Sequence, residues 1–129
     1  MFIPYPKVAL YIESGPSGKH LFVIVTAPTK SCDDILLLNF TSIYEGAHFD
    51  PACVVEPGEH PFITKKSYVF YNKAMIRSSK EIELKIREKK ISIHSKSVSQ
   101  DLFNKIIAGI STSKEIPTEI IDFYDSRVA

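Results

Sequence analysis

The apolar positions of the chain change their spacing, from short continuous runs in the first part to helical spacing near the C-terminus. Residues 21–26 (LFVIVT) and 35–40 (ILLLNF) are apolar at successive positions, which predicts strands buried on both faces. Residues 8–13 alternate weakly and are also typical of a strand. Residues 14–18 (SGPSG) predict a turn, so the segments on either side of them are expected to pair as a hairpin.

Shorter strands are predicted farther along the chain. Residues 54–55, 67–71, 74–76 and 90–94 each contain a short apolar or alternating stretch of strand length. Residues 79–86 contain the sequence EIELKI, which fits either a short helix or a frayed strand. Both interpretations of that segment stay open.

The C-terminal quarter of the chain has the spacing of amphipathic helices. Five apolar residues fall on one face of a helix predicted over residues 100–110: Leu102, Phe103, Ile106, Ile107 and Ile110. Ser99 is placed to cap the start of this helix, and Gly109 is expected to weaken its end. Pro117 suits the first position of a last helix over residues 117–124.

The order of the predicted elements indicates the fold class. Many short strands joined by glycine- and proline-containing turns are typical of a small barrel or a strongly bent sheet. We expect a mainly β protein with C-terminal α-helices, in which residues 1–94 form the barrel core and residues 95–129 the helical addition. A chain of 129 residues is long enough to form one such domain around its own core.

Composition narrows the class of protein without assigning a function. The formal net charge of +1 argues against a strongly basic nucleic-acid coat protein, but it is compatible with a local basic patch. No apolar run approaches the ~20 residues of a membrane helix, and Pro4 and Pro6 interrupt the region where a signal peptide is apolar. We therefore expect a cytoplasmic protein without membrane contact. Cys32 and Cys53 have no CxxC spacing and are expected to be reduced, although a disulfide between them stays open.

The polar connection over residues 42–61 holds most of the candidate chemistry. Loops of this length in compact domains are usually functional or disordered. Its possible acids, bases and metal ligands are His48, Asp50, Cys53, Glu56, Glu59 and His60. Pro57 and Pro61 restrict the backbone on either side of His60, which makes that histidine the first candidate for a functional role.

Metal binding and nucleophilic catalysis by a cysteine are two further kinds of chemistry that this connection could support. His48, Asp50, Cys53 and His60 offer nitrogen, oxygen and sulfur ligands for zinc, but their spacing matches no standard zinc motif. Asp50 precedes a proline, and Asp-Pro favours a turn. Cys53 lies among apolar neighbours and has the character of a small buried residue more than that of a nucleophile. We expect no metal and no cofactor.

Residues 19–79 carry a series of segments that resembles the MazF/PemK toxin family. The strand LFVIVT is followed by ILLLNFTS, which ends in Thr41 and Ser42, then by the long connection and by KKSYVFYNKAMIRSS. Where the family usually has an arginine before the first of these strands, this chain has Lys19 and His20. The resemblance implies an SH3-like barrel and metal-independent cleavage of single-stranded RNA in a toxin–antitoxin system. It also implies an antitoxin partner and a homodimer.

Cleavage of RNA by its 2′-hydroxyl needs a base, an acid, and groups that stabilise the phosphate. The residues proposed for catalysis are His60, His48 and Thr41. The residues proposed to bind RNA or phosphate are Lys19, His20, Ser42, Lys65 and Lys66. Tyr44, Phe49 and Phe62 are candidates for stacking on bases.

The sequence thus leads to a toxin-like endoribonuclease as the first hypothesis. The alternative is a non-catalytic barrel that binds a protein or a nucleic acid. The missing first-loop arginine and the near-neutral charge favour the alternative, because a lysine lacks the bidentate phosphate geometry of an arginine. The density of histidines, lysines and hydroxyl groups favours the enzyme.

Overall fold

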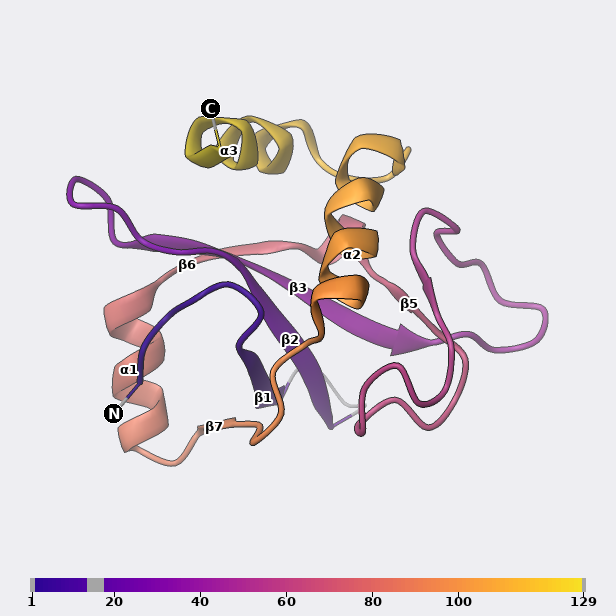
Figure 1. Ribbon diagram of the computed structural model, residues 1–129, viewed down its shortest axis with the longest axis horizontal. Helices are drawn as coiled ribbons and strands as arrows, with labels where there is room; N and C mark the ends of the chain where they lie inside the picture. The colour runs from indigo at the N-terminus through magenta and orange to yellow at the C-terminus, as the bar shows by residue number, and fades with distance from the viewer. Residues whose placement is uncertain (1, 14–17, 129) are drawn as a thin grey trace.

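The computed structural model describes residues 2–13 and 18–128, and its strands and helices are shown in Figure 1. The strands are β1 (Ala9–Glu13), β2 (Lys19–Thr26), β3 (Asp34–Ser42), β4 (Val54–Val55), β5 (Ser67–Val69), β6 (Met75–Ser78) and β7 (Ile91–Ile93). The helices are α1 (Ser79–Arg87), α2 (Gln100–Thr112), α3 (Thr118–Val128) and the short 3-10 helix η2 (Tyr71–Lys73). The predicted turn at residues 14–18 lies outside the described residues, except for its last position.

The strands form one antiparallel sheet in the order β4-β5-β3-β2-β1-β7. Strand β3 lies at its centre, with β2 along one side. Its other side pairs with β6 through its first residues and with β5 through its last residues. The helix η2 lies between β5 and β6, so these two strands together act as one strand that is interrupted by a helical turn. The expected pairing of the first two strands as an antiparallel pair is confirmed.

The sheet is covered on both faces, which explains why its central strands are apolar at successive positions. Leu21, Val23 and Val25 of β2 belong to one core cluster, together with apolar residues of α2 and α3. Phe22 and Ile24 belong to a second cluster on the opposite face, which α1 and the N-terminal segment complete. The predicted burial of residues 21–26 on both faces is therefore confirmed.

Residues 79–86, for which the sequence allowed either a short helix or a frayed strand, form a helix. Two side chains cap its first turn. The Ser78 hydroxyl accepts a hydrogen bond from the Glu81 backbone N–H at 3.3 Å. The Asp33 carboxylate accepts hydrogen bonds from the hydroxyls of Ser78, at 2.5 Å, and Ser79, and from the Lys80 backbone N–H at 3.1 Å. These hydrogen bonds lower the pKa of Asp33 to about 2. Asp33 lies just before β3, so the start of α1 is attached to the central strand.

The two C-terminal helices form where they are predicted, but both extend beyond their predicted ends. The Ser99 hydroxyl accepts from the Leu102 backbone N–H at 3.1 Å, which confirms the predicted cap of α2. Helix α2 continues past Gly109 to Thr112, beyond its predicted end at residue 110. Helix α3 begins one residue after Pro117 and runs to Val128, beyond the predicted end.

The expectation of a mainly β barrel with C-terminal helices is met only in part, as a small fold of one sheet and several helices. Strand and helix content are about equal, partly because α1 falls within the region predicted as barrel. Within the described residues, β4 and β7 are the outer strands and do not pair with each other, so the sheet is open.

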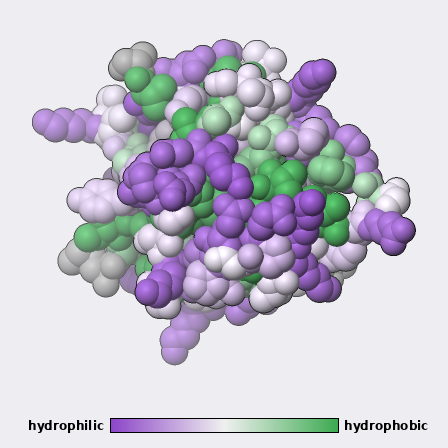
Figure 2. Space-filling model, turned by 45° about the vertical axis from the view of Figure 1, so that its right-hand side comes forward, coloured by the Kyte–Doolittle hydropathy of each residue, from purple (hydrophilic) through white to green (hydrophobic). Residues whose placement is uncertain are grey.

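None of the helices in the described part of the chain is long and apolar enough to cross a membrane. In the view of Figure 2, hydrophilic side chains project from the surface and hydrophobic ones lie in patches between them.

Candidate functional site

A cleft of about 370 Å³ lies at the end of the sheet where β2 begins and β3 ends. We call it the basic cleft. Five of the eight predicted site residues line it: Lys19, His20, Thr41, Ser42 and Lys65. Two of the three predicted stacking residues, Tyr44 and Phe62, line it as well. The predicted phosphate-binding residues thus converge to a large extent in one place.

Strand pairing explains this convergence. Lys19 and His20 are the first residues of β2, and Thr41 and Ser42 are the last residues of β3. Since β2 and β3 are antiparallel, with Phe22 opposite Asn39, the start of one strand lies beside the end of the other. In this register, the pairing of the two apolar runs brings the polar residues at their ends together.

One wall of the basic cleft is formed by residues 62–65, which directly follow the long connection. Backbone hydrogen bonds hold this wall in place: Ile63 N–H donates to the His60 carbonyl at 2.9 Å, and Gly58 N–H donates to the Ile63 carbonyl at 3.0 Å. The Phe62 ring contacts the Tyr11 ring edge to face, with 5.3 Å between their centroids. The wall is therefore an ordered part of the fold.

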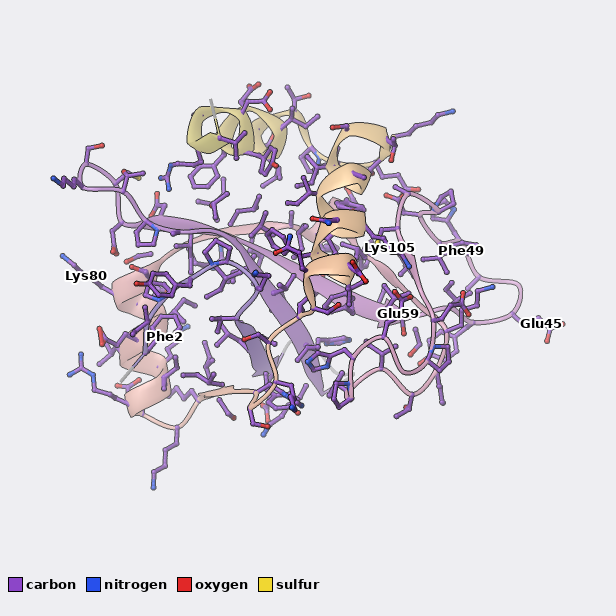
Figure 3. All side chains as sticks on the ribbon, in the orientation of Figure 1. Phe2, Glu45, Phe49, Glu59, Lys80 and Lys105 are labelled. Carbon is purple, nitrogen blue, oxygen red and sulfur yellow. The ribbon has the colours of Figure 1, made fainter. Side chains whose placement is uncertain are left out.

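The connection is also attached to α2. The ammonium group of Lys105 donates to both carboxylate oxygens of Glu59, at 2.9 and 3.0 Å, and Figure 3 shows these two side chains directed toward each other. The second oxygen of Glu59 also accepts from the Glu56 backbone N–H at 2.7 Å. Glu59, one of the acidic residues noted in the sequence, therefore has a structural role.

The basic cleft has a positive charge. Lys19 and Lys65 are exposed, and neither takes part in an ion pair within the described residues. No aspartate or glutamate belongs to the described residues that line it. Thr64 and Ser67, which flank the Lys65-Lys66 pair, add hydroxyl groups, and of these two only Thr64 had no role predicted from the sequence. The Ser67 hydroxyl donates to the Lys65 carbonyl at 2.8 Å and so supports the backbone that carries that lysine.

His60, the first candidate for acid–base chemistry, lies outside the basic cleft and is 2% exposed. Its Nδ1 accepts from the Phe62 backbone N–H at 3.1 Å, and its Nε2–H donates to the Lys96 carbonyl at 2.8 Å. Its ring also contacts the His94 ring, with 4.6 Å between centroids. Burial lowers the pKa of His60. Both ring nitrogens are thus used to fix the connection against residue 96, which leaves neither for a substrate.

The other two predicted site residues are also separate from the basic cleft. His48 is exposed, and its Nε2–H donates to the Glu115 carboxylate at 2.6 Å. Lys66 is directed toward Glu56, with 3.9 Å between the charged atoms. Phe49, the third stacking candidate, packs against Tyr68, with 5.9 Å between ring centroids. It extends from the connection near Glu45, as Figure 3 shows.

The four residues considered for zinc have separate partners. Asp50 is buried and accepts from the Ala52 backbone N–H at 3.0 Å and the Ser113 hydroxyl at 2.6 Å, which confirms its role in a turn. Cys53 lies in the core, where burial raises the pKa of its thiol to about 11. Across residues 2–13 and 18–128, no three His, Cys, Asp or Glu side chains gather closely enough to hold a metal ion.

No protein-family model, curated protein or solved structure matches this chain. The chemistry of the basic cleft is therefore the basis for a functional proposal. Its lysines are suited to an anionic group, its hydroxyls to phosphate oxygens, and its aromatic rings to planar bases. His20 is the only histidine among the described residues that line it, and so the only imidazole placed for proton transfer there.

Proposed function

We propose that the basic cleft binds single-stranded RNA. The observation that carries this proposal is the combination of Lys19 and Lys65 with hydroxyl groups and aromatic rings, in a cleft whose described lining contains no carboxylate. Lysines attract the phosphates, and Tyr44, whose surface is 63% exposed, offers a ring on which a base stacks. A single strand suits this site because its bases are accessible to the rings.

A stronger form of the proposal adds cleavage of the bound strand. A base removes the proton of a 2′-hydroxyl, the 2′-oxygen attacks the adjacent phosphorus, and the 5′-oxygen leaves with a proton. We assign His20 to proton transfer, Lys19 and Lys65 to the phosphate charge, and Thr41 to a hydrogen bond with a phosphate oxygen. His48 and His60 receive no role in this step, because neither lines the basic cleft.

The family and the biological role belong to the same proposal. The order of segments in residues 19–79 supports membership in a MazF/PemK-like toxin group, with the open sheet as a divergent form of its SH3-like barrel. A neutralising antitoxin and a homodimer follow from that membership. Induction of the protein in bacteria is then expected to arrest growth, and co-expression of the cognate antitoxin to restore it. Normal growth at high levels of folded protein contradicts the toxin role.

One observation favours binding without cleavage as a second function. The two histidines first expected to share acid and base roles lie outside the basic cleft, so His20 is the one imidazole among its described lining residues. A non-catalytic module that holds a single strand needs only the lysines, the hydroxyls and the rings.

Binding is tested by fluorescence anisotropy with a labelled single-stranded RNA. Lys65→Ala is expected to weaken binding roughly three- to tenfold, because it removes one charged phosphate contact. Lys66→Ala is the matched control, since Lys66 has the same charge at the next position but points toward Glu56. Equal effects of the two substitutions, or no binding by the wild type, contradict the proposed site.

Cleavage is tested on the same RNA by gel electrophoresis in the presence of a chelator. The wild type is expected to yield fragments with a 5′-hydroxyl, whereas His20→Ala is expected to bind without cutting. An RNA with a 2′-deoxy sugar at the cleaved position is expected to bind but to stay intact. Stable binding with no fragments from either protein supports the non-catalytic module instead.

A further inference from the structure

A second cleft, of about 450 Å³, adjoins the basic cleft, and Lys19 lines both of them. We call it the lysine cleft. Its other cations are Lys85, Lys89 and Lys90, which come from the end of α1 and the turn that follows it. Ile12 and Ile91 supply apolar lining, and Glu13 is the acidic residue among its described lining.

The fold explains why the two clefts share a lysine. Glu13 ends β1 and lies opposite Lys19 at the start of β2, and Ile12 lies opposite Ile91 at the start of β7. The end of α1 leads directly into β7, so its lysines reach the same corner of the sheet. Lys19 therefore occupies the boundary between the lysines of α1 and the polar ends of β2 and β3.

The charges of this corner are only partly compensated. Lys85 is 3.9 Å from Glu81 and Lys90 is 3.4 Å from Glu88, and both pairs are exposed and so weak. Lys19 and Lys89 take part in no ion pair within the described residues. The positive charge that this corner offers to a ligand therefore comes mainly from Lys19 and Lys89.

The backbone at Lys89 has a conformation that suits glycine. Lys89 ends the turn after α1 with φ = 63°, a left-handed conformation that glycine adopts more easily than any other residue. The turn is closed by hydrogen bonds from Lys89 N–H to the Ile86 carbonyl, at 3.0 Å, and from Lys90 N–H to the Lys85 carbonyl, at 2.8 Å. The charge of the Lys89 side chain also suits the negative end of the helix dipole.

We propose that the two clefts form one continuous track for a single RNA strand, with Lys19 at their junction. This inference rests on the proposed binding of RNA in the basic cleft. Phosphates of the extended strand contact Lys89 and Lys90, while Ile12 and Ile91 contact the faces of the sugars or bases. A short RNA fills the basic cleft alone, and a longer one also occupies the lysine cleft.

Two RNA lengths and a fold-preserving variant test the track. Affinities of the full chain are measured by anisotropy for single strands of roughly 4 and roughly 12 nucleotides. Lys89→Gly removes the side chain and suits the backbone, so its Tm is expected to equal or exceed that of the wild type. It is expected to weaken binding of the long RNA at least about threefold and to reduce the slope of log K against log salt by about 0.7. Binding of the short RNA is expected not to change.

Lys80→Ala is the matched control, because Lys80 is an exposed lysine of the same helix that lines neither cleft. Its affinities are expected to equal those of the wild type for both lengths. Long-RNA affinity that is the same in Lys89→Gly and the wild type overturns the track, and so does an equal loss in Lys80→Ala. If the track is overturned in this way but Lys65→Ala still weakens RNA binding, the proposed binding in the basic cleft is kept and only the track is rejected. If neither RNA binds to the wild type, the proposed function itself fails.

Discussion

The hydroxyl of Tyr71 occupies the space beside Gly109 where any other residue would place its Cβ. An ideal Cβ at position 109 would lie 1.9 Å from the Tyr71 hydroxyl oxygen and 2.6 Å from its ring carbon. The same hydroxyl donates to the Ile106 carbonyl at 2.8 Å, and Tyr71 is fully buried. This contact joins the middle of α2 to the helical turn between β5 and β6. The glycine is therefore a packing requirement of the sheet, although in the sequence it resembles a helix-weakening residue.

Gly109→Ala is expected to destabilise the protein by about 1–3 kcal/mol, because the added methyl group collides with a buried ring. On helix propensity alone, the same change would stabilise the protein by up to about 1 kcal/mol. Urea unfolding monitored by circular dichroism decides between the two signs. Ser111→Ala, on the exposed side of the same helix, is the control and is expected to change stability little. A Gly109→Ala variant as stable as the wild type would contradict the contact.

Asp33 is expected to make stability depend on acid pH. Its folded pKa of about 2 lies below the ordinary 3.8, so the unfolded chain binds the proton more readily. The contribution of Asp33 is complete above pH 3.8 and is lost as the pH falls toward about 2. Unfolding free energies of wild type and Asp33→Asn are therefore expected to converge across that range.

Ser79→Ala removes one of the hydroxyl donors to Asp33 and is expected to raise the pKa of that carboxyl. The pH at which the Asp33 contribution disappears should then move upward. NMR titration of the Asp33 carboxyl carbon measures both effects directly. An identical stability difference between wild type and Asp33→Asn at every pH would show that the helix cap does not depend on the charge.

His60 is expected to destabilise the fold in mild acid. Burial lowers its pKa from the ordinary 6.5, and the nearby His94 acts in the same direction. Since the unfolded chain then binds the proton more readily, the stability contributed by neutral His60 is complete above pH 6.5 and decreases as the pH falls below it. Thermal unfolding at about pH 8 and about pH 5.5 is expected to show a larger loss of Tm in the wild type than in His60→Gln.

His60→Gln also separates a structural role from a catalytic one. The variant is expected to have a lower Tm at neutral pH, because a buried hydrogen-bonded ring is lost, but to cleave RNA at the wild-type rate when folded. A folded His60→Gln protein that binds RNA normally and has lost cleavage would return His60 to the catalytic residues.

Tyr44→Ala is expected to weaken binding of single-stranded RNA by about 1–3 kcal/mol, the usual effect of losing one stacked base. Tyr5→Ala is a close control, because Tyr5 is 62% exposed and Tyr44 is 63% exposed, but Tyr5 does not line the basic cleft. Tyrosine fluorescence or anisotropy with the same RNA measures the difference. Equal affinities in the two variants would remove Tyr44 from the binding site.

Local sequence signals predicted most elements of this fold. The apolar runs of β2 and β3 and the apolar spacing of α2 are strong, because each pattern is repeated over several neighbouring residues. The cap of α1 is only partly local, because Ser78 and Glu81 have the spacing of a capping box whereas Asp33 reaches the same turn from far away in the sequence. The open sheet was also unpredictable, because strand order depends on which edges meet in space.

In the candidate site too, some residues could be grouped from local sequence signals, whereas the roles of others depend on distant contacts. Lys19, His20, Thr41 and Ser42 could be grouped from the sequence, because they end two apolar runs that pair antiparallel. The roles of His48 and His60 could not be read in this way. Their partners, Glu115 and the carbonyl of residue 96, are distant in the chain.

By itself the sequence determined where strands and helices form and which polar residues stand at their ends, because those properties depend on neighbours along the chain. Only the tertiary structure decided which polar side chains remain available to a ligand. Burial and hydrogen bonding depend on contacts between distant segments, and these contacts use both nitrogens of His60 while they leave Lys19 and Lys65 exposed.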